Sequence, residues 1–208
     1  MKHNRQTIVD KLMSWLGAHE GDAVHKHIVD TYNSQKPLPS GYVLKYTDAW
    51  CAATVSAAAI EVGYTDIIPT ECSCKRMIEK AQKMGIWQER DDYVPKIADI
   101  VLYDWDDNNV GDNTGIPDHV GLVVTNPQNN LFQVGEGNKS DAVGLRTMTV
   151  NGRYIRGYIT PKYDADVSDN VTIKPSVSPT TQKPQTKGKL GIDVSSCQTA
   201  VDFAKVKS

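Results

Sequence analysis

The spacing of apolar residues changes from a helical period to a strand period along the first 163 residues, and this order constrains the fold most. Helical spacing predicts helices over residues 8–17, over residues 48–62 and from just after residue 70 to residue 85. Strand patterns follow at 100–103, 119–124, 131–134 and 154–159. Helices followed by strands predict an α+β domain in which N-terminal helices pack on an antiparallel sheet.

The charge balance excludes one broad class of partner. The 208 residues include 23 Lys and Arg against 25 Asp and Glu, so the chain lacks the positive charge with which nucleic-acid-binding proteins neutralise phosphates. Hydrophobic residues make up 39% of the chain, as in folded globular proteins, yet no run approaches the roughly 18 apolar residues of a membrane helix. We expect a monomer that binds neither nucleic acid nor membrane.

The composition changes sharply after Tyr163 and divides the chain into three parts. Residues 1–163 form the predicted domain. Residues 164–189 contain three prolines among Ser, Thr, Lys and Gln and no aromatic residue, which predicts a disordered linker. Residues 190–208 turn apolar again but are too few to form a core, so we interpret them as the incomplete start of another domain.

Cys51 is the candidate nucleophile. If Asp48 is the N-cap, Cys51 lies in the first helical turn, where the helix dipole and unpaired N–H groups favour a thiolate and can stabilise an oxyanion. The structural alternative is a small buried cysteine that packs beneath Trp50. Cys72 and Cys74 do not have zinc-site spacing, and we expect them to pack in the core.

A histidine and a carboxylate could complete the site. His119 begins one predicted strand, and Glu136 follows the next strand along the chain. Neighbouring strands would present these side chains together, as the base and the orienting group of cysteine acyl transfer. Taken singly, the alternatives are a structural histidine and a solvated loop carboxylate.

Three ordered motifs resemble those of the CHAP domain, a family of cysteine, histidine-dependent amidohydrolases and peptidases found in phage lysins and bacterial wall hydrolases. The motifs are YTDAWCAA at 46–53, PDHVG at 117–121 and EGN at 136–138. The resemblance covers about residues 1–163 and implies a papain-like fold. It also implies a peptidoglycan substrate, cleaved without a cofactor at the N-acetylmuramoyl-L-alanine bond or within the stem peptide.

The same resemblance implies a role for each matching residue. Cys51 would be the nucleophile, His119 the general base and Glu136 the group that orients the imidazole, with Asn138 as a further polar residue of the site. Neighbouring residues are candidates for substrate binding, namely Asp48, Trp50, Trp105 and Asp118.

The chain departs from the family pattern in two places. It lacks the alternating aspartates with which some phage members bind calcium before the nucleophile, so we expect no metal. A separate acidic segment, 104–112, does not match the EF-hand pattern. It is either a solvated loop, a rim of the cleft that pairs with amines of the substrate, or a site of nonspecific cation binding. Where the family commonly has glycine in a turn, this chain has Ala98, which would cost about 1 kcal/mol if φ is positive.

The C-terminal segment has a resemblance of its own. Residues 191–198 and 201–207 are similar to the opening of family 25 glycoside hydrolases, with Asp193 at the place of an active-site aspartate. Glycoside cleavage needs a second carboxylate, which this chain ends too early to supply, so we expect no muramidase activity. Two wall-cutting domains joined by a linker nevertheless resemble a lysin.

These observations predict a thiol-dependent peptidoglycan hydrolase. Without an apolar secretion signal, it is expected in the cytoplasm of a bacterial host and would reach the wall after membrane permeabilisation. Two alternatives stay open: a cysteine peptidase that acts on protein, and a non-catalytic wall-binding module.

Overall fold

A computed structural model describes residues 2–90, 92–107 and 115–164. The helices are α1 (Arg5–Met13), α2 (Ala23–Asn33), α3 (Cys51–Val62) and α4 (Cys74–Lys83), with a short 3-10 helix at Pro39–Gly41. The strands are β1 (Trp87–Gln88), β2 (Ile100–Tyr103), β3 (His119–Val123), β4 (Leu131–Glu136), β5 (Gly144–Thr149) and β6 (Ile155–Ile159). Apart from Asp164, the predicted linker and partial domain lie outside the described residues.

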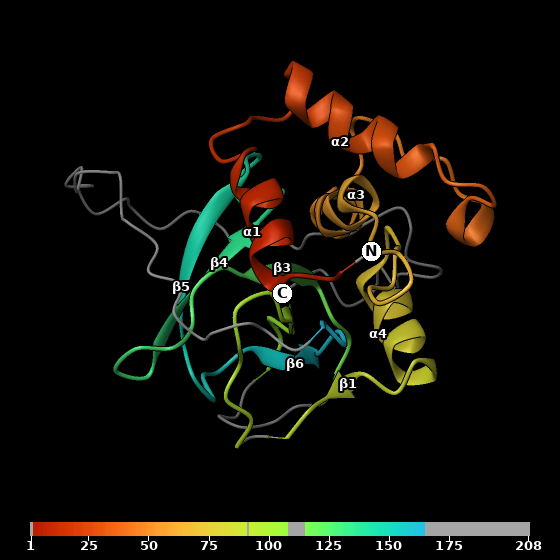
Figure 1. Cartoon of the computed structure of the whole chain (residues 1–208). Helices are drawn as coiled ribbons and strands as arrows, with labels where there is room; N and C mark the ends of the chain where they lie inside the picture. The colour runs from red at the N-terminus through yellow and green to blue at the C-terminus, as the bar shows by residue number, and fades with distance from the viewer. Residues whose placement is uncertain (1, 91, 108–114, 165–208) are drawn as a thin grey trace, which may run out of the picture.

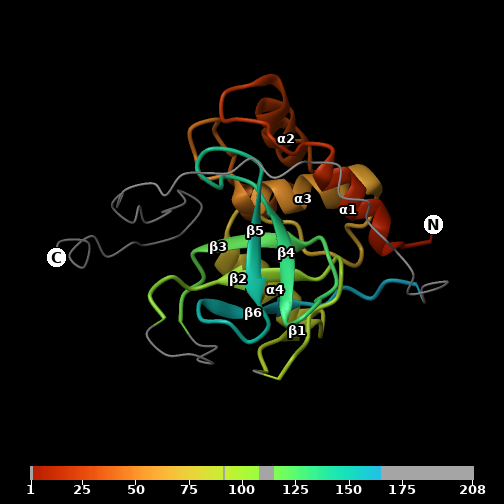
Figure 2. The same cartoon turned by 90° about the vertical axis from the view of Figure 1, so that its left-hand side faces the viewer.

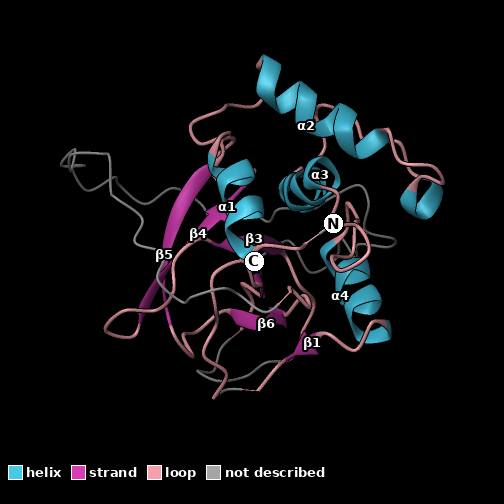
Figure 3. Cartoon of the chain, in the orientation of Figure 1, coloured by secondary structure: helices cyan, strands magenta, loops and turns pink. Residues whose placement is uncertain are grey.

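The strands form one antiparallel sheet in the order β1-β6-β2-β3-β4-β5. Helices α1 to α4 precede β1 along the chain, and Figures 1 and 3 show them gathered beside the sheet. The expectation of an α+β domain with N-terminal helices and an antiparallel sheet is confirmed. None of the described helices is long and apolar enough to cross a bilayer.

The alternation of side chains along the strands builds two separate cores. On one face, Ile100, Leu102 and Val120 pack with the helices in the larger core. On the other face, a smaller cluster contains Val101, Tyr103, Val123, Phe132, Val134, Ile155 and Tyr158. Figure 2 shows β4 and β5 running steeply across the direction of β2 and β3, so the sheet is strongly twisted. The position of a residue on its strand therefore decides which core it faces.

Helix α3 lies at the centre of the helical layer because its side chains are small. It contacts α1, α2, β3 and β4, and Ala52, Ala53 and Ala57 are fully buried. Gly63 ends the helix in the left-handed conformation, as its C-terminal position predicted.

The segment after α1 differs from the sequence prediction. Apolar spacing predicted no element between residues 17 and 48, yet residues 23–33 form α2, and His25 lies in its first turn. The Asp22 carboxylate accepts the N–H of His25 and caps the helix, and the imidazole packs against Trp50 with ring centroids 4.8 Å apart. His25 is fully buried, whereas His19 and His27 are exposed.

His25 should make the stability of the fold depend on pH. Its Nδ1 accepts the Gly21 N–H at 2.9 Å, which requires a neutral ring, and burial lowers the pKa of His25. Because the unfolded chain binds the proton more readily, this contribution is present above pH about 6.5 and is lost as the pH falls below that value. Urea unfolding should show a smaller loss of stability between pH about 7 and about 5 for His25→Gln than for the wild type or exposed His27→Gln. Equal losses would contradict the prediction.

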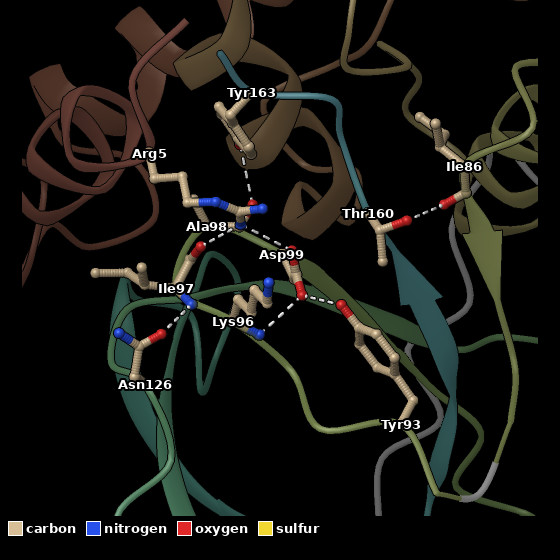
Figure 4. Close-up of polar contacts among 10 residues, drawn as sticks. All are labelled: Arg5, Ile86, Tyr93, Lys96, Ile97, Ala98, Asp99, Asn126, Thr160 and Tyr163. Carbon is tan, nitrogen blue, oxygen red and sulfur yellow. Dashed lines mark hydrogen bonds and ion pairs between the residues drawn. The ribbon is translucent and has the colours of Figure 1, made fainter. Parts of the chain in front are cut away.

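A buried carboxylate ties the turn before β2 to the N-terminal helix, as Figure 4 shows. Asp99 is fully buried, and its Oδ1 accepts Arg5 Nη1 at 3.0 Å. Its Oδ2 accepts the Lys96 N–H at 2.8 Å and the hydroxyl of Tyr93. Arg5 also donates to the carbonyl of Ile97 at 2.7 Å. These bonds hold the chain that leads into β2.

Replacing Asp99 with alanine should destabilise the protein by about 3 kcal/mol, because it leaves three donors without their acceptor. Urea unfolding would measure the loss. Asp92→Ala is the matched control, since the Asp92 carboxylate pairs with Arg90 at the surface and its side chain is 74% exposed. An Asp99 variant as stable as the Asp92 variant would show that the buried network contributes nothing.

Ala98, in the same turn, has a φ of 67°, so the turn does place alanine in the left-handed region. Its N–H donates to Val123 at 2.7 Å, and its carbonyl accepts the hydroxyl of Tyr163 at 3.0 Å. These two bonds hold a conformation that costs alanine about 1 kcal/mol.

Candidate active site

Cys51 is the first residue of α3 rather than its third. The predicted N-cap, Asp48, does not cap the helix, because its Oδ2 accepts the Lys45 N–H at 2.9 Å and the Tyr42 hydroxyl at 2.8 Å. Trp50 occupies the N-cap position, but its side chain forms no capping hydrogen bond with the helix. Cys51 therefore lies at the opening of the helix, where backbone N–H groups have no acceptor within the helix.

His119 and Glu136 come together from β3 and β4. His119 Nε2 lies 3.3 Å from Glu136 Oε2, and their side chains are 4% and 0% exposed. Burial raises the pKa of Glu136, but hydrogen bonds from His119 and Arg146 outweigh it and bring the pKa below the ordinary glutamate value. An ionised carboxylate only accepts hydrogen bonds, so Nε2–H donates and the neutral ring keeps a lone pair on Nδ1. In this form the ring can accept a proton at Nδ1.

The thiol of Cys51 contacts both His119 and a second thiol. The Sγ atoms of Cys51 and Cys74 lie 4.0 Å apart, and both cysteines are free. The hydrogen bond with Cys74 and burial raise the pKa of Cys51 well above its ordinary value, whereas a hydrogen bond with His119, and the positive charge of that ring when it is protonated, lower it. The upward direction prevails, so the resting site favours a thiol and not the thiolate that the helix position alone predicts. Attack on a carbonyl then needs a base.

Arg146 is a residue of this site that the sequence analysis missed. It lies on β5, and its Nε donates to Glu136 Oε1 at 2.7 Å and to Oε2 at 3.0 Å. The guanidinium carbon lies 5.0 Å from the ring centroid of Trp105 and 5.7 Å from that of Tyr103. The segment around Arg146 is polar and has no motif, so only its pairing with β4 identifies it.

Two glycines let the site residues approach one another. A Cβ at Gly121 would lie 2.7 Å from Glu136 Cγ, so this glycine leaves room for the carboxylate side chain. A Cβ at Gly137 would lie 1.9 Å from Thr54 Oγ1, so the end of β4 rests directly on the first turns of α3. Both glycines belong to the motifs around His119 and Glu136.

An aromatic side chain flanks the histidine. Trp105 is partly exposed and stacks on Tyr103 with centroids 4.9 Å apart, and its ring lies 6.1 Å from that of His119. Asp118 accepts the Trp105 N–H at 2.8 Å and so holds the loop that carries the indole. Trp105 is therefore placed to contact a molecule bound at His119.

The remaining residues that the sequence suggested for the site are Trp50, Asp48 and Asn138, and the first two have structural roles. Trp50 is fully buried and donates from Nε1 to Glu20 at 3.3 Å, so it belongs to the core and does not offer a surface for substrate. The Asp48 carboxylate is likewise engaged in the turn before α3. Asn138 lies two residues beyond Glu136, in a turn where its φ is 55° and its side chain is partly exposed.

The acidic segment 104–112 is described only as far as residue 107. Asp104 and Asp107 are buried, and Asp104 Oδ1 accepts the Asp106 N–H at 3.0 Å. Within the described residues, no group of three or more His, Cys, Asp or Glu side chains is arranged to hold a metal ion.

The chain matches no family model, no curated protein and no solved structure. The interpretation of the site therefore depends on its own geometry and on the motifs in the sequence.

Proposed function

We propose that this protein is a cysteine-dependent hydrolase of the CHAP type, with a papain-like fold, that cleaves an amide bond of bacterial peptidoglycan. One observation carries the proposal. Cys51 at the start of α3, His119 at the start of β3 and Glu136 at the end of β4 form a chain of contacts in that order. This is the order of nucleophile, base and orienting group that acyl transfer requires.

The proposed reaction follows from the protonation states. His119 accepts the proton of the Cys51 thiol as sulfur attacks the amide carbonyl, and the N–H groups at the start of α3 stabilise the oxyanion. His119 then gives that proton to the departing amine, which leaves a thioester on Cys51. Water hydrolyses the thioester, again with His119 as the base. Glu136 holds Nε2–H throughout, and the reaction needs no cofactor.

The choice of peptidoglycan is supported by the three CHAP-like motifs and not by a bound ligand. The proposal covers two bonds, the one between N-acetylmuramic acid and L-alanine and an amide of the stem peptide. A protein peptidase would use the same three residues, and a wall-binding module would use none of them catalytically. Each of these predicts a different product pattern.

The test is digestion of purified Gram-positive peptidoglycan by the wild type, by Cys51→Ala and by the matched variant Cys74→Ala. Mass spectrometry would identify the fragments, and new amino ends would be counted. We expect new amino ends with the wild type and Cys74→Ala but none with Cys51→Ala, and the fragment masses would identify the bond. Turnover of casein but not of the wall would indicate a protein peptidase. Wall binding without any release by folded protein would reject the hydrolase.

A further inference from the structure

The buried carboxylate of Glu136 has two neighbouring groups that can balance its charge. They are the imidazole of His119 at 3.3 Å and the guanidinium of Arg146, which reaches both carboxylate oxygens. A fully buried carboxylate needs a positive partner, because isolated charge is strongly unfavourable away from water. If His119 were the only partner, it would be held protonated and could not accept a proton from Cys51.

Other groups around the pair do not supply this charge. Cys51 of α3 adjoins the imidazole, with Cys74 of α4 behind it, and both are thiols. Tyr103 of β2 is buried beside Glu136, and its own pKa is raised by burial and by the charge of Glu136. Among these neighbours, only Arg146 carries a permanent positive charge.

The environment of Arg146 also fixes where that charge lies. Its guanidinium packs against the rings of Trp105 and Tyr103, which hold the planar group beside Glu136. Its side chain is 32% exposed, so the arginine remains partly hydrated while the carboxylate is fully buried.

We propose that Arg146 is a positioning residue that neutralises and orients Glu136, so that His119 remains a neutral base in the resting enzyme. The activity readout rests on the proposed hydrolase function. Without Arg146, the buried negative charge of Glu136 must be balanced by a protonated His119 or removed by protonation of Glu136 itself. Either change impairs transfer of the Cys51 proton.

Two measurements on the full chain test this role without relying on amide cleavage. In Arg146→Met, the NMR titration of the His119 ring should move to higher pH by about one unit, since a nearby positive charge is lost. The pH midpoint for alkylation of Cys51 by iodoacetamide should move in the same direction. Arg146→Lys retains the charge and should restore most of both midpoints.

The matched control is Arg156→Met. Arg156 also packs on a tryptophan, with its guanidinium 5.5 Å from the Trp87 centroid, but it pairs with Glu89 at 2.8 Å and donates to the carbonyl of Gly115 at 2.9 Å. If the wild type cleaves peptidoglycan, kcat at pH about 7 should be about 10²-fold lower in Arg146→Met, with little change in KM. Unchanged midpoints in folded Arg146→Met would overturn the proposal. A rise in KM alone would instead make Arg146 a substrate-binding residue and would also overturn it.

A second, independent observation concerns the two thiols. Cys51 and Cys74 are each the first residue of a helix, and their Sγ atoms are 4.0 Å apart. A disulfide needs a separation of about 2 Å, so the two sulfur atoms must move closer together before they can be linked. We infer that peroxide can link Cys51 to Cys74 and thereby switch off the nucleophile reversibly.

The chemistry has two steps. Peroxide oxidises the Cys51 thiol to a sulfenic acid and is reduced to water. The thiol of Cys74 then attacks the sulfenic sulfur, forms the disulfide and releases a second water. A dithiol reductant restores both thiols and is itself oxidised to a disulfide.

Peptide mass mapping of the full chain after hydrogen peroxide treatment tests this inference. We expect a Cys51–Cys74 crosslink in the wild type, and dithiothreitol should restore alkylation of Cys51. In Cys74→Ala, which cannot form the crosslink, Cys51 should proceed to the sulfinic acid and should not recover. Equal sulfinic acid formation in both proteins would overturn the inference. Because mapping and alkylation do not require amide cleavage, the result is separate from the fate of the hydrolase proposal.

Discussion

His119→Ala is expected to reduce amide hydrolysis by about 10³- to 10⁴-fold, because the resting site favours a thiol that needs a base. The pKa of Cys51 lies well above its ordinary value, and His119 is the neighbour that lowers it. Removal of the imidazole therefore removes both the proton acceptor and the group that favours ionisation. The measurement is the initial rate of release of amino ends from peptidoglycan, normalised to folded protein.

Two further variants make this result specific. His27→Ala changes an exposed histidine that pairs with Glu61 on the surface of the helical layer, and it should leave the rate unchanged. Glu136→Gln keeps a side chain of the same shape at the end of β4 but removes its charge, so the rate should fall by less than in His119→Ala. A His119→Ala rate within about tenfold of the wild type would place the base elsewhere.

Gly137→Ala is expected to destabilise the fold by about 3 kcal/mol, the largest stability change that we predict for a single methyl group. The new Cβ would lie 1.9 Å from Thr54 Oγ1 and 2.6 Å from Thr54 Cβ, so the end of β4 must move away from α3. Glu136 is the adjacent residue and would move with it. Urea unfolding measures the stability, and the rate of Cys51 alkylation reports on the site.

A double mutant separates this close contact from a general intolerance of alanine. Thr54→Ala removes the nearest atom and should restore part of the stability of Gly137→Ala, which gives a favourable coupling of about 1 kcal/mol or more. Gly144→Ala on neighbouring β5 is the control. Its Cβ would lie 3.2 Å from Cδ of Lys139, whose flexible side chain can move aside. Similar losses for Gly144→Ala and Gly137→Ala would refute the explanation.

Much of the fold could be predicted because several elements have a clear local period. The strands at 100–103 and 131–134 and the end of α3 at Gly63 occur where the apolar spacing places them. Helix α2 and strand β5 were missed for opposite reasons. The first half of α2 is rich in histidine and its buried apolar residues lie near its middle and end, whereas β5 is polar and only partly buried.

The candidate site could be predicted only in part. Cys51, His119 and Glu136 each stand at the end of a predicted element, so local sequence already places them where loops bring side chains together. Asp48 was wrongly expected to cap α3, because its carboxylate is taken by Tyr42 and Lys45 in the preceding turn. A carboxylate in sequence has several nearby donors, and packing decides among them.

The sequence by itself determined the order of helices and strands and the residues at their ends, since a period and a helix stop are properties of neighbouring residues. Only the tertiary structure placed Cys74 beside Cys51 and Arg146 beside Glu136. These contacts join α4 to α3 and β5 to β4, and they depend on how twisted strands and closely packed helices fit together. That fit is a property of the whole core, so no local sequence pattern predicts these contacts.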